Sequence, residues 1–343
     1  MSDIVVIGAG PAGCAAAIGL ARAGRDVTLL ERAPAPRESV CGEFLGGDAV
    51  ALLHGLGIDL PALGAVRLTS ARAAAGTRQS SAALPFEAYG LARRRLDAAL
   101  QQAAQEAGAR LVRGVTVQAM QPRPAGWEVA GLRPRAVVLA TGKHSMRGHP
   151  RLAGRGAVGL KLHLDGLDLP PAVTLLRFAG GYAGLQPGAE GSANLCAALT
   201  GTPPAGVEAF LDRVRGGSAL AERLLRDARP LWPRPLAVAG VPYGFVQRGG
   251  CDGLYRVGDQ VSVIHSFTGD GMAMALASGL AAAEAMVAGQ GASEFHAAWR
   301  RRSVGQMRLA TAGAWLMRRM PGTFVTAMGT PMAHWAMHGT RVA

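Results

Sequence analysis

Several features that define special classes of protein are missing from this sequence. Its 343 residues include four cysteines, which lie far apart and form no CxxC pair, so neither a disulfide framework nor a zinc cluster is expected. The N-terminus has no basic stretch followed by an apolar stretch, and no signal peptide is predicted. The longest apolar run, residues 272–288, is interrupted by Glu284, which favours a buried helix over a membrane span. These absences predict a cytoplasmic protein, with attachment to the periphery of a membrane as an open alternative.

Charged residues are also scarce, at 17% of the chain against 49% apolar residues, which is the balance of a globular protein. Basic residues still outnumber acidic residues by 36 to 23, and the net charge of +13 favours acidic partners such as nucleotides, a membrane surface or an acidic carrier protein. Lysine occurs only at Lys143 and Lys161, a bias that a GC-rich genome would produce without any functional cause. The arginine runs are not interleaved with aromatic residues, so no nucleic acid partner is expected.

Residues 3–32 have the order of a Rossmann βαβ unit. An apolar run at residues 4–7 is typical of a parallel strand that is buried on both faces. Good helix formers occupy residues 12–23, and a second apolar run follows at 27–30. Because strand, glycine-rich loop, helix, strand and terminal acid occur in the right order, the segment predicts dinucleotide binding.

The loop of this unit carries a GxGxxG motif. Its first glycine allows the tight turn, its second lets the backbone approach a pyrophosphate, and its third lets the helix pack on the strand. The acid at the end of the second strand can accept hydrogen bonds from both ribose hydroxyls. The motif alone does not separate FAD from NAD. The residues predicted to hold the dinucleotide here are Gly8, Gly10, Pro11, Ala12, Gly13, Glu31 and Arg32.

A second constellation, at residues 252–284, separates the two cofactors. A strand at 254–257 leads to a Gly-Asp pair, a glycine-rich turn and a long helix. This order resembles the second FAD fingerprint of the para-hydroxybenzoate hydroxylase and geranylgeranyl reductase superfamily. In that superfamily the Asp binds the ribityl and ribose region, and the helix start directs its amides towards the flavin and pyrophosphate. The resemblance implies cofactor contacts at Gly258, Asp259, Gly269, Gly271 and Met272.

Two shorter segments resemble the same superfamily. Residues 90–100, GLARRRLDAAL, are similar to a segment in which an Arg before a Leu-Asp pair contacts the cofactor. Arg93 is the predicted residue, with Arg94 and Arg95 as alternatives, and a solvated basic helix start is the other interpretation. Residues 136–142, AVVLATG, are similar to the strand and turn that pass the adenine side, which implies contacts from Thr141 and Gly142.

The chain has no second GxGxxG after a strand. A dedicated NAD(P)H domain of the glutathione reductase kind is therefore not expected. If NAD(P)H is the reductant, it must dock transiently.

Residues 37–48, RESVCGEFLGGD, resemble the loop that lies beside the isoalloxazine ring. The Cys-Gly-Glu triplet resembles the geranylgeranyl reductase branch, in which the Cys lines the substrate cavity next to the flavin. Cys41 and Glu43 are predicted catalytic residues, and Arg37, Cys41 and Gly42 are predicted cofactor contacts. The other interpretation of Cys41 is a small apolar residue in the core.

Residues 154–200 alternate apolar and polar positions, which predicts antiparallel strands with one buried face. Within them, GGYAGLQPGAEGSANL resembles the geranylgeranyl reductase signature of a Tyr, a Trp two residues on, then an aromatic and a Pro. Tyr182 matches and is a predicted catalytic residue. Gly184 replaces the Trp and Gln186 replaces the aromatic. Since those aromatics shape a cavity for a polyprenyl chain, their loss opens the cavity to a bulkier or differently shaped substrate.

The segment from residue 293 onwards is helical in character and rich in Arg, Met and Trp. It could form a lid or a surface that meets a membrane or a lipid carrier, but a packed helical tail with extended Arg side chains is favoured. His334 and His338 have the spacing of metal ligands on a helix. The intervening Trp335 is not the Glu of a metalloprotease, and no metal site is predicted.

The predicted fold is α/β, with a Rossmann-type (GR2-like) FAD-binding domain, an inserted antiparallel-sheet substrate domain and a helical C-terminus. The resemblance implies a discontinuous FAD-binding domain. Its predicted parts are residues 1–62, 86–153 and 246–292. The predicted substrate domain comprises 63–85 and 154–245, and the helical segment comprises 293–343.

These motifs identify the chain as a member of the geranylgeranyl reductase-like branch of FAD-dependent oxidoreductases, near the flavin hydroxylases and halogenases. The implied activity is reduction or dehydrogenation of a hydrophobic organic substrate, such as a secondary metabolite or an isoprenoid-like molecule. One alternative is an FAD-dependent monooxygenase that uses NAD(P)H and O2. Another is an FAD-binding partner or sensor protein without turnover. A halogenase is disfavoured because no WxWxIP-like motif occurs.

Overall fold

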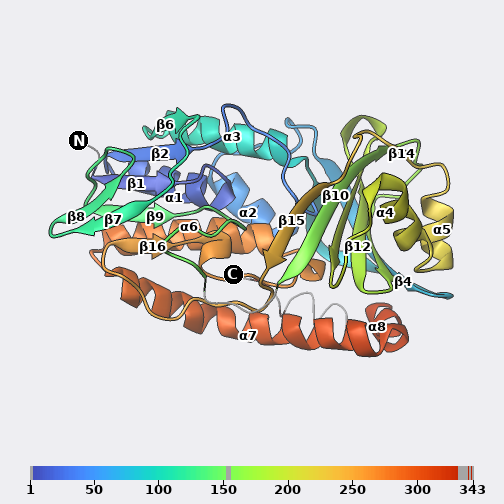
Figure 1. Ribbon diagram of the computed structural model, residues 1–343. Helices are drawn as coiled ribbons and strands as arrows, with labels where there is room; N and C mark the ends of the chain where they lie inside the picture. The colour runs from blue at the N-terminus through green and yellow to red at the C-terminus, as the bar shows by residue number, and fades with distance from the viewer. Residues whose placement is uncertain (1–2, 152–155, 331–338, 340, 342–343) are drawn as a thin grey trace.

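The computed structural model describes residues 3–151, 156–330, 339 and 341. Its strands form a parallel sheet and a larger, mostly antiparallel sheet, which lie side by side (Figure 1). The long C-terminal helix α7 (Ala292–Arg319) runs along the lower edge of both in this view (Figure 1). The predicted α/β class, with a Rossmann-type sheet, a second antiparallel sheet and C-terminal helices, is confirmed.

The parallel sheet contains the Rossmann unit at its centre. Side chains of its first strand alternate between the faces, so that Val6 joins the apolar cluster on the helical side and Val5 joins the cluster on the other side. The hairpin of β7 (Met120–Arg123) and β8 (Gly126–Val129) covers that other side. The strand order is β16 (Leu254–Arg256), β9 (Ala136–Leu139), β1 (Ile4–Ile7), β2 (Val27–Glu31) and β6 (Arg110–Arg113).

The helical side of this sheet is covered by α1 (Pro11–Arg22), α2 (Gly47–Gly55), α3 (Arg93–Glu106) and α6 (Gly271–Val287), and α7 joins the same apolar cluster. Small residues let α1 and α6 approach closely, because a Cβ on Gly279 would overlap the carbonyl oxygen of Ala12. This contact brings together the two segments that carry the glycine motifs, although they are far apart in the sequence.

The second sheet is antiparallel at every neighbouring pair except one. Strands β4 and β11 pair in parallel, since they come from distant segments and are not joined by a hairpin. A short 3-10 helix, η1 (Ala189–Gly191), lies in the turn after β12. The strand order is β14 (Arg229–Pro230), β10 (Ala157–Asp165), β13 (Ala193–Leu199), β12 (Gly181–Pro187), β11 (Ala172–Phe178), β4 (Val66–Ala75), β5 (Arg78–Gly90) and β3 (Phe44–Leu45), with β15 (Leu236–Val241) also paired to β10.

The two faces of this second sheet have different neighbours. Helices α4 (Gly206–Arg215) and α5 (Ala219–Leu224) cover one face and pack on the leucines of β10. The alternating residues of β10, Lys161 and His163, point to the opposite face, which meets the loop after β2. Part of the same sheet is covered by α8 (Pro321–Met328), which packs on β4 and β5.

The predicted C-terminal helices are present as α7 and α8. His334, Trp335 and His338 lie outside the described residues. Among the residues that are described, no helix combines the length and the apolar character needed to cross a bilayer.

Candidate functional site

A cavity of about 710 Å³ opens between the carboxyl ends of the parallel strands and the second sheet. Its lining comes from the loops after β1, β2 and β9, from the start of α6, and from β10, β13 and β15. Ligands of open α/β sheets bind at the carboxyl ends of the strands, so the cavity has the expected position for a dinucleotide.

Most of the residues predicted from the sequence line this one cavity, although they come from six separate segments. Gly13 and Tyr182 are not among the lining residues. A Cβ on Gly13 would overlap the carbonyl oxygen of Gly8, so this glycine lets α1 pack on the loop. The predicted residues that line the cavity are Gly8, Gly10, Pro11, Ala12, Glu31, Arg32, Arg37, Cys41, Gly42, Glu43, Arg93, Thr141, Gly142, Gly258, Asp259, Gly269, Gly271 and Met272.

The βαβ unit provides groups that suit the phosphate and ribose of a dinucleotide. Helix α1 begins at Pro11, so the free amides of its first turn lie at the cavity. The carboxylate of Glu31 accepts hydrogen bonds from the amides of Ala9, at 2.9 Å, and Ala33, at 2.8 Å. These two amides use one hydrogen bond at each carboxylate oxygen, so Glu31 can still accept hydrogen bonds from the ribose hydroxyls. The residues present therefore fit FAD.

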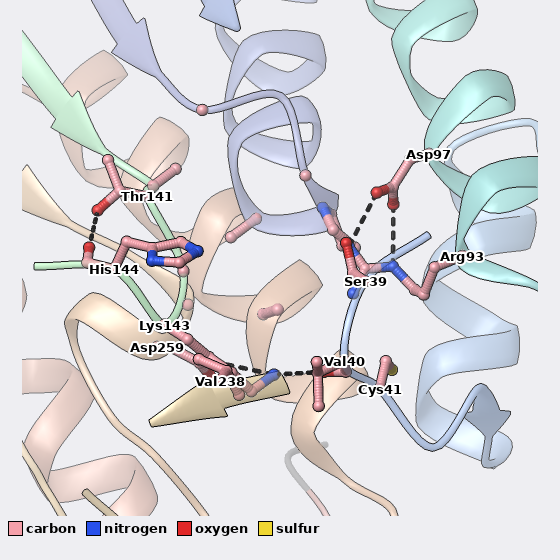
Figure 2. Close-up of a pocket in the computed structure, with 18 of the residues that line it drawn as sticks. Ser39, Val40, Cys41, Arg93, Asp97, Thr141, Lys143, His144, Val238 and Asp259 are labelled. Atoms are coloured by element: carbon pink, nitrogen blue, oxygen red, sulfur yellow. Dashed lines mark hydrogen bonds and ion pairs between the residues drawn. The ribbon is translucent and has the colours of Figure 1, made fainter. Parts of the chain in front are cut away.

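Arg93 is held beside the glycine motif. Its guanidinium makes a bidentate pair with Asp97 at 3.0 and 2.9 Å, which Figure 2 shows at one side of the cavity. A Cβ on Gly10 would lie 3.7 Å from Arg93 Nη2. The two alternative arginines point elsewhere, because Arg94 lies 3.8 Å from Glu38 and Arg95 pairs with Glu190.

The opposite wall of the cavity carries Lys143, which the sequence motifs did not identify. Its Nζ donates to the carbonyl oxygen of Val40 at 3.0 Å and lies 3.8 Å from the carboxylate of Asp259 (Figure 2). Gly258 has φ +58°, and a Cβ there would lie 2.9 Å from Ala12. The second fingerprint thus packs directly against the start of α1.

A buried group of charges holds the Cys-Gly-Glu loop from the side of the second sheet. Lys161 is fully buried and donates to Glu38, at 2.8 Å, and to Glu43. His163 Nε2 lies 3.1 Å from the other oxygen of Glu43, and the amide of Arg93 donates to Glu43 at 3.0 Å. Three groups thus hold the Glu43 carboxylate, and through it the loop: the Lys161 ammonium, the His163 imidazole and the Arg93 amide.

The charges around Glu43 determine its ionisation. Burial would raise the pKa of Glu43, but the hydrogen bond from His163 and the charge of Lys161 lower this pKa to about 2. Burial would likewise lower the pKa of Lys161, and the charges of Glu43 and Glu38 raise it instead. Glu43 is therefore a carboxylate and Lys161 an ammonium at neutral pH.

A chain of three hydroxyls lies at the far end of the cavity. Ser266 Oγ, in the short 3-10 helix η3 (Ser266–Thr268), is 2.7 Å from the phenol oxygen of Tyr182 and 2.9 Å from that of Tyr243. Ser266 and Tyr243 line the cavity, and Tyr182 lies behind them. Burial raises the pKa of Tyr182 to about 12 and that of Tyr243 well above its ordinary value, so both phenols keep their protons.

Sequence reasoning missed five residues that the fold brings to the site. A signal was available for two of them, since Lys161 and His163 alternate with leucines in a predicted strand and so share its less apolar face. No local pattern marks the others, which are Lys143, Tyr243 and Ser266.

Comparison with known proteins agrees with this geometry. The family model of FAD-dependent oxidoreductases matches residues 3–42. Digeranylgeranylglycerophospholipid reductase 2 of Methanopyrus kandleri is 30% identical over 313 residues, which are 82% of this chain and 76% of that protein. Menaquinone reductase of Mycobacterium tuberculosis is 39% identical over 124 residues, which are 35% of this chain and only 30% of that reductase.

Solved structures share the whole fold. A flavin-dependent brominase superposes with a TM-score of 0.80 at 21% identity, covering 100% of this chain and 94% of the brominase. A geranylgeranyl bacteriochlorophyll reductase-like protein of Thermoplasma acidophilum gives 0.78 at 19% identity, covering 98% and 95%. The cavity, the family match over residues 3–42 and the Methanopyrus kandleri reductase together define the chain as an FAD-dependent oxidoreductase. Within that class, the chain belongs to the geranylgeranyl reductase family.

Proposed function

We propose that this protein reduces a hydrophobic, isoprenoid-like organic molecule at an FAD held in the cavity. The observation that carries the proposal is the apolar wall beside the Cys41 loop and the start of α6. It is formed by Leu236, Val238, Val241, Val263, Ile264 and Met272. Such a wall excludes water from the space next to the flavin fingerprints and suits an apolar substrate. The reductase relatives named above support the same type of reaction.

Bound FAD would supply the hydride, and the chain must then supply the accompanying proton. Reduction of a carbon–carbon double bond adds a hydride to one carbon and a proton to its neighbour. We assign the proton to the Ser266 hydroxyl, which recovers a proton from Tyr243, and water then returns a proton to the Tyr243 phenol. Tyr182 acts through Ser266 as a positioning residue. Cys41 contacts the substrate, while Glu43, which is ionised, positions the loop.

The electron donor that we propose is NAD(P)H, docking transiently at the mouth of the cavity. Arg32, Arg37 and Arg147 are exposed there, beside His144. Burial and the positive charges of Arg32, Arg37, Lys143 and Arg151 lower the pKa of His144. Such a rim suits the phosphates of a dinucleotide.

An anaerobic experiment tests the reaction type. The FAD-loaded protein is reduced with NADPH, mixed with a menaquinone analogue or a polyprenyl alkene, and followed by the visible absorbance of flavin. We expect reoxidation without oxygen and formation of the reduced product. Reoxidation that requires oxygen and yields a hydroxylated product would show the monooxygenase instead. Flavin that no donor or acceptor can cycle would show a binding protein without turnover.

The proposed proton path makes a separate prediction for Ser266→Ala. Because a positioned general acid typically contributes on the order of 10²-fold or more, kcat is expected to fall by about that factor while FAD remains bound. Tyr182→Phe is expected to have a smaller effect, since the serine remains. Steady-state rates and a pH profile measure this, with Ser81→Ala, an exposed serine of β5 that does not line the cavity, as the matched control. An unchanged kcat and pH profile in Ser266→Ala would exclude this serine as the donor.

A further inference from the structure

Helix α7 presents a long cationic stripe to solvent. Its exposed positions recur three and four residues apart, as one face of a helix requires. The opposite face packs inward through Phe295, Trp299 and Met317. The stripe consists of Arg300, Arg301, Val304, Arg308, Trp315, Arg318 and Arg319, and we refer to it as the α7 stripe.

The charge of the stripe is not balanced nearby in the sequence. Glu294 is the last acidic residue of the chain. Within the part of the chain that the structure describes, no acidic side chain lies in ion-pair contact with the five arginines of the stripe. Among the described residues these five arginines form no ion pair with an acidic side chain, so they are available to an anionic surface.

Apolar side chains lie among these arginines. The described residues leave five large apolar side chains exposed, and three of them are in the stripe or at the C-cap of α7. They are Val304 at 38%, Trp315 at 54% and Met320 at 46% exposure. A solvated basic face has no need of an exposed Trp, whereas Trp and Arg together are typical of residues at a membrane interface.

We propose that the α7 stripe docks the protein on the surface of an anionic bilayer. A helix of 28 residues is about 42 Å long, so it can place all five arginines over lipid headgroups at once. The intervening Val304 and Trp315 then enter the region between headgroups and acyl chains. The apolar residues within the stripe favour lipid over an acidic protein, which would satisfy the arginines alone.

Helices α7 and α8 both contact Phe267, the residue next to Ser266 at the cavity. Phe267, next to Ser266, packs edge-on against Phe324 of α8 at a ring distance of 5.9 Å. A Cβ on Gly313 of α7 would lie 2.9 Å from the Phe267 ring. Docking through the α7 stripe therefore brings the hydroxyl end of the cavity near the bilayer, although the docking itself does not depend on the proposed reaction.

Vesicle binding tests this surface without any turnover. The FAD-loaded protein is sedimented with vesicles of phosphatidylcholine alone or mixed with phosphatidylglycerol. We expect strong binding only to the mixed vesicles and loss of binding at high salt. Since each arginine near an anionic surface contributes about 1 kcal/mol, Arg308→Gln/Arg319→Gln is expected to lower the partition constant on the order of 30-fold. Brominated lipids are expected to quench Trp fluorescence in the natural protein more than in Trp315→Phe.

The matched control carries the same charge change elsewhere. Arg223→Gln/Arg226→Gln alters two exposed arginines at α5, on the far face of the second sheet, and is expected to bind like the natural protein. If both double variants lose vesicle binding equally, the loss reflects the net charge of the protein and not the α7 stripe, and the proposal is overturned. Equal binding to both kinds of vesicle, or binding to neither kind, would overturn it as well.

Discussion

Gly10→Val protein is expected to fold and to be colourless. A Cβ at Gly10 would contact only Arg93, at the ordinary van der Waals distance of 3.7 Å. The substitution therefore causes no clash that would displace the backbone. The branched side chain instead extends into the cavity at the start of α1, where the pyrophosphate must approach the amides. Flavin absorbance per mole of purified protein measures retention, and circular dichroism measures folding. A fully yellow Gly10→Val protein would falsify the placement of the pyrophosphate.

Two further glycine variants separate loss of cofactor from loss of fold. Gly13→Ala places a Cβ onto the carbonyl oxygen of Gly8, so α1 must move and both stability and FAD binding are expected to fall. Gly55→Ala, at the last residue of α2, has nothing within 4 Å of the new Cβ. This control is expected to bind FAD fully and to unfold at the same temperature or slightly higher.

The contrast between these glycines shows why the FAD-binding half could be predicted from sequence. The requirements at Gly8 and Gly13 include local ones, because Gly8 has φ +102° and a Cβ on Gly13 would overlap the carbonyl oxygen of Gly8. A motif of neighbouring residues can therefore encode these two requirements, although a Cβ on Gly8 would also meet the distant Ala140. Arg93 is a weaker case, since three consecutive arginines fit the pattern and the pair with Asp97, four residues on, is formed by only the first.

The other half of the site depends on contacts between distant segments. Glu43 meets Lys161 across 118 positions of sequence, and Tyr182 meets Ser266 across 84. Neither pair has a spacing that a motif could encode. The parallel pairing of β4 with β11 is of the same kind, because it depends on which edges meet when the sheet closes. Prediction from sequence thus reached many of the residues that line the cavity, Glu43 included, and missed Lys161 and His163, which hold Glu43 from the second sheet.

The buried charges around Glu43 should have the largest effect on stability. Lys161→Met removes the ammonium and leaves Glu43 ionised in the interior, and breaking a buried ion pair in this way costs about 3–5 kcal/mol. The free energy of unfolding, measured in urea with saturating FAD, is expected to fall by about that amount. Arg94→Met is the matched control, since Arg94 also lies near Glu38 but its side chain is 63% exposed. Its loss should cost less than about 1 kcal/mol.

Removing both charges distinguishes an ion-pair effect from a packing effect. In Lys161→Met/Glu43→Gln no unpaired buried carboxylate remains at position 43, so the double variant is expected to be more stable than Lys161→Met. The pH dependence gives a second criterion. Because the pKa of Glu43 is lowered to about 2, its contribution is complete above its ordinary value of 4.5 and is lost as the pH falls from 4.5 towards 2. The natural protein should lose stability in that range, and Glu43→Gln should lose less. If the double variant is no more stable than Lys161→Met, the lysine stabilises the loop through its packing and not through its charge.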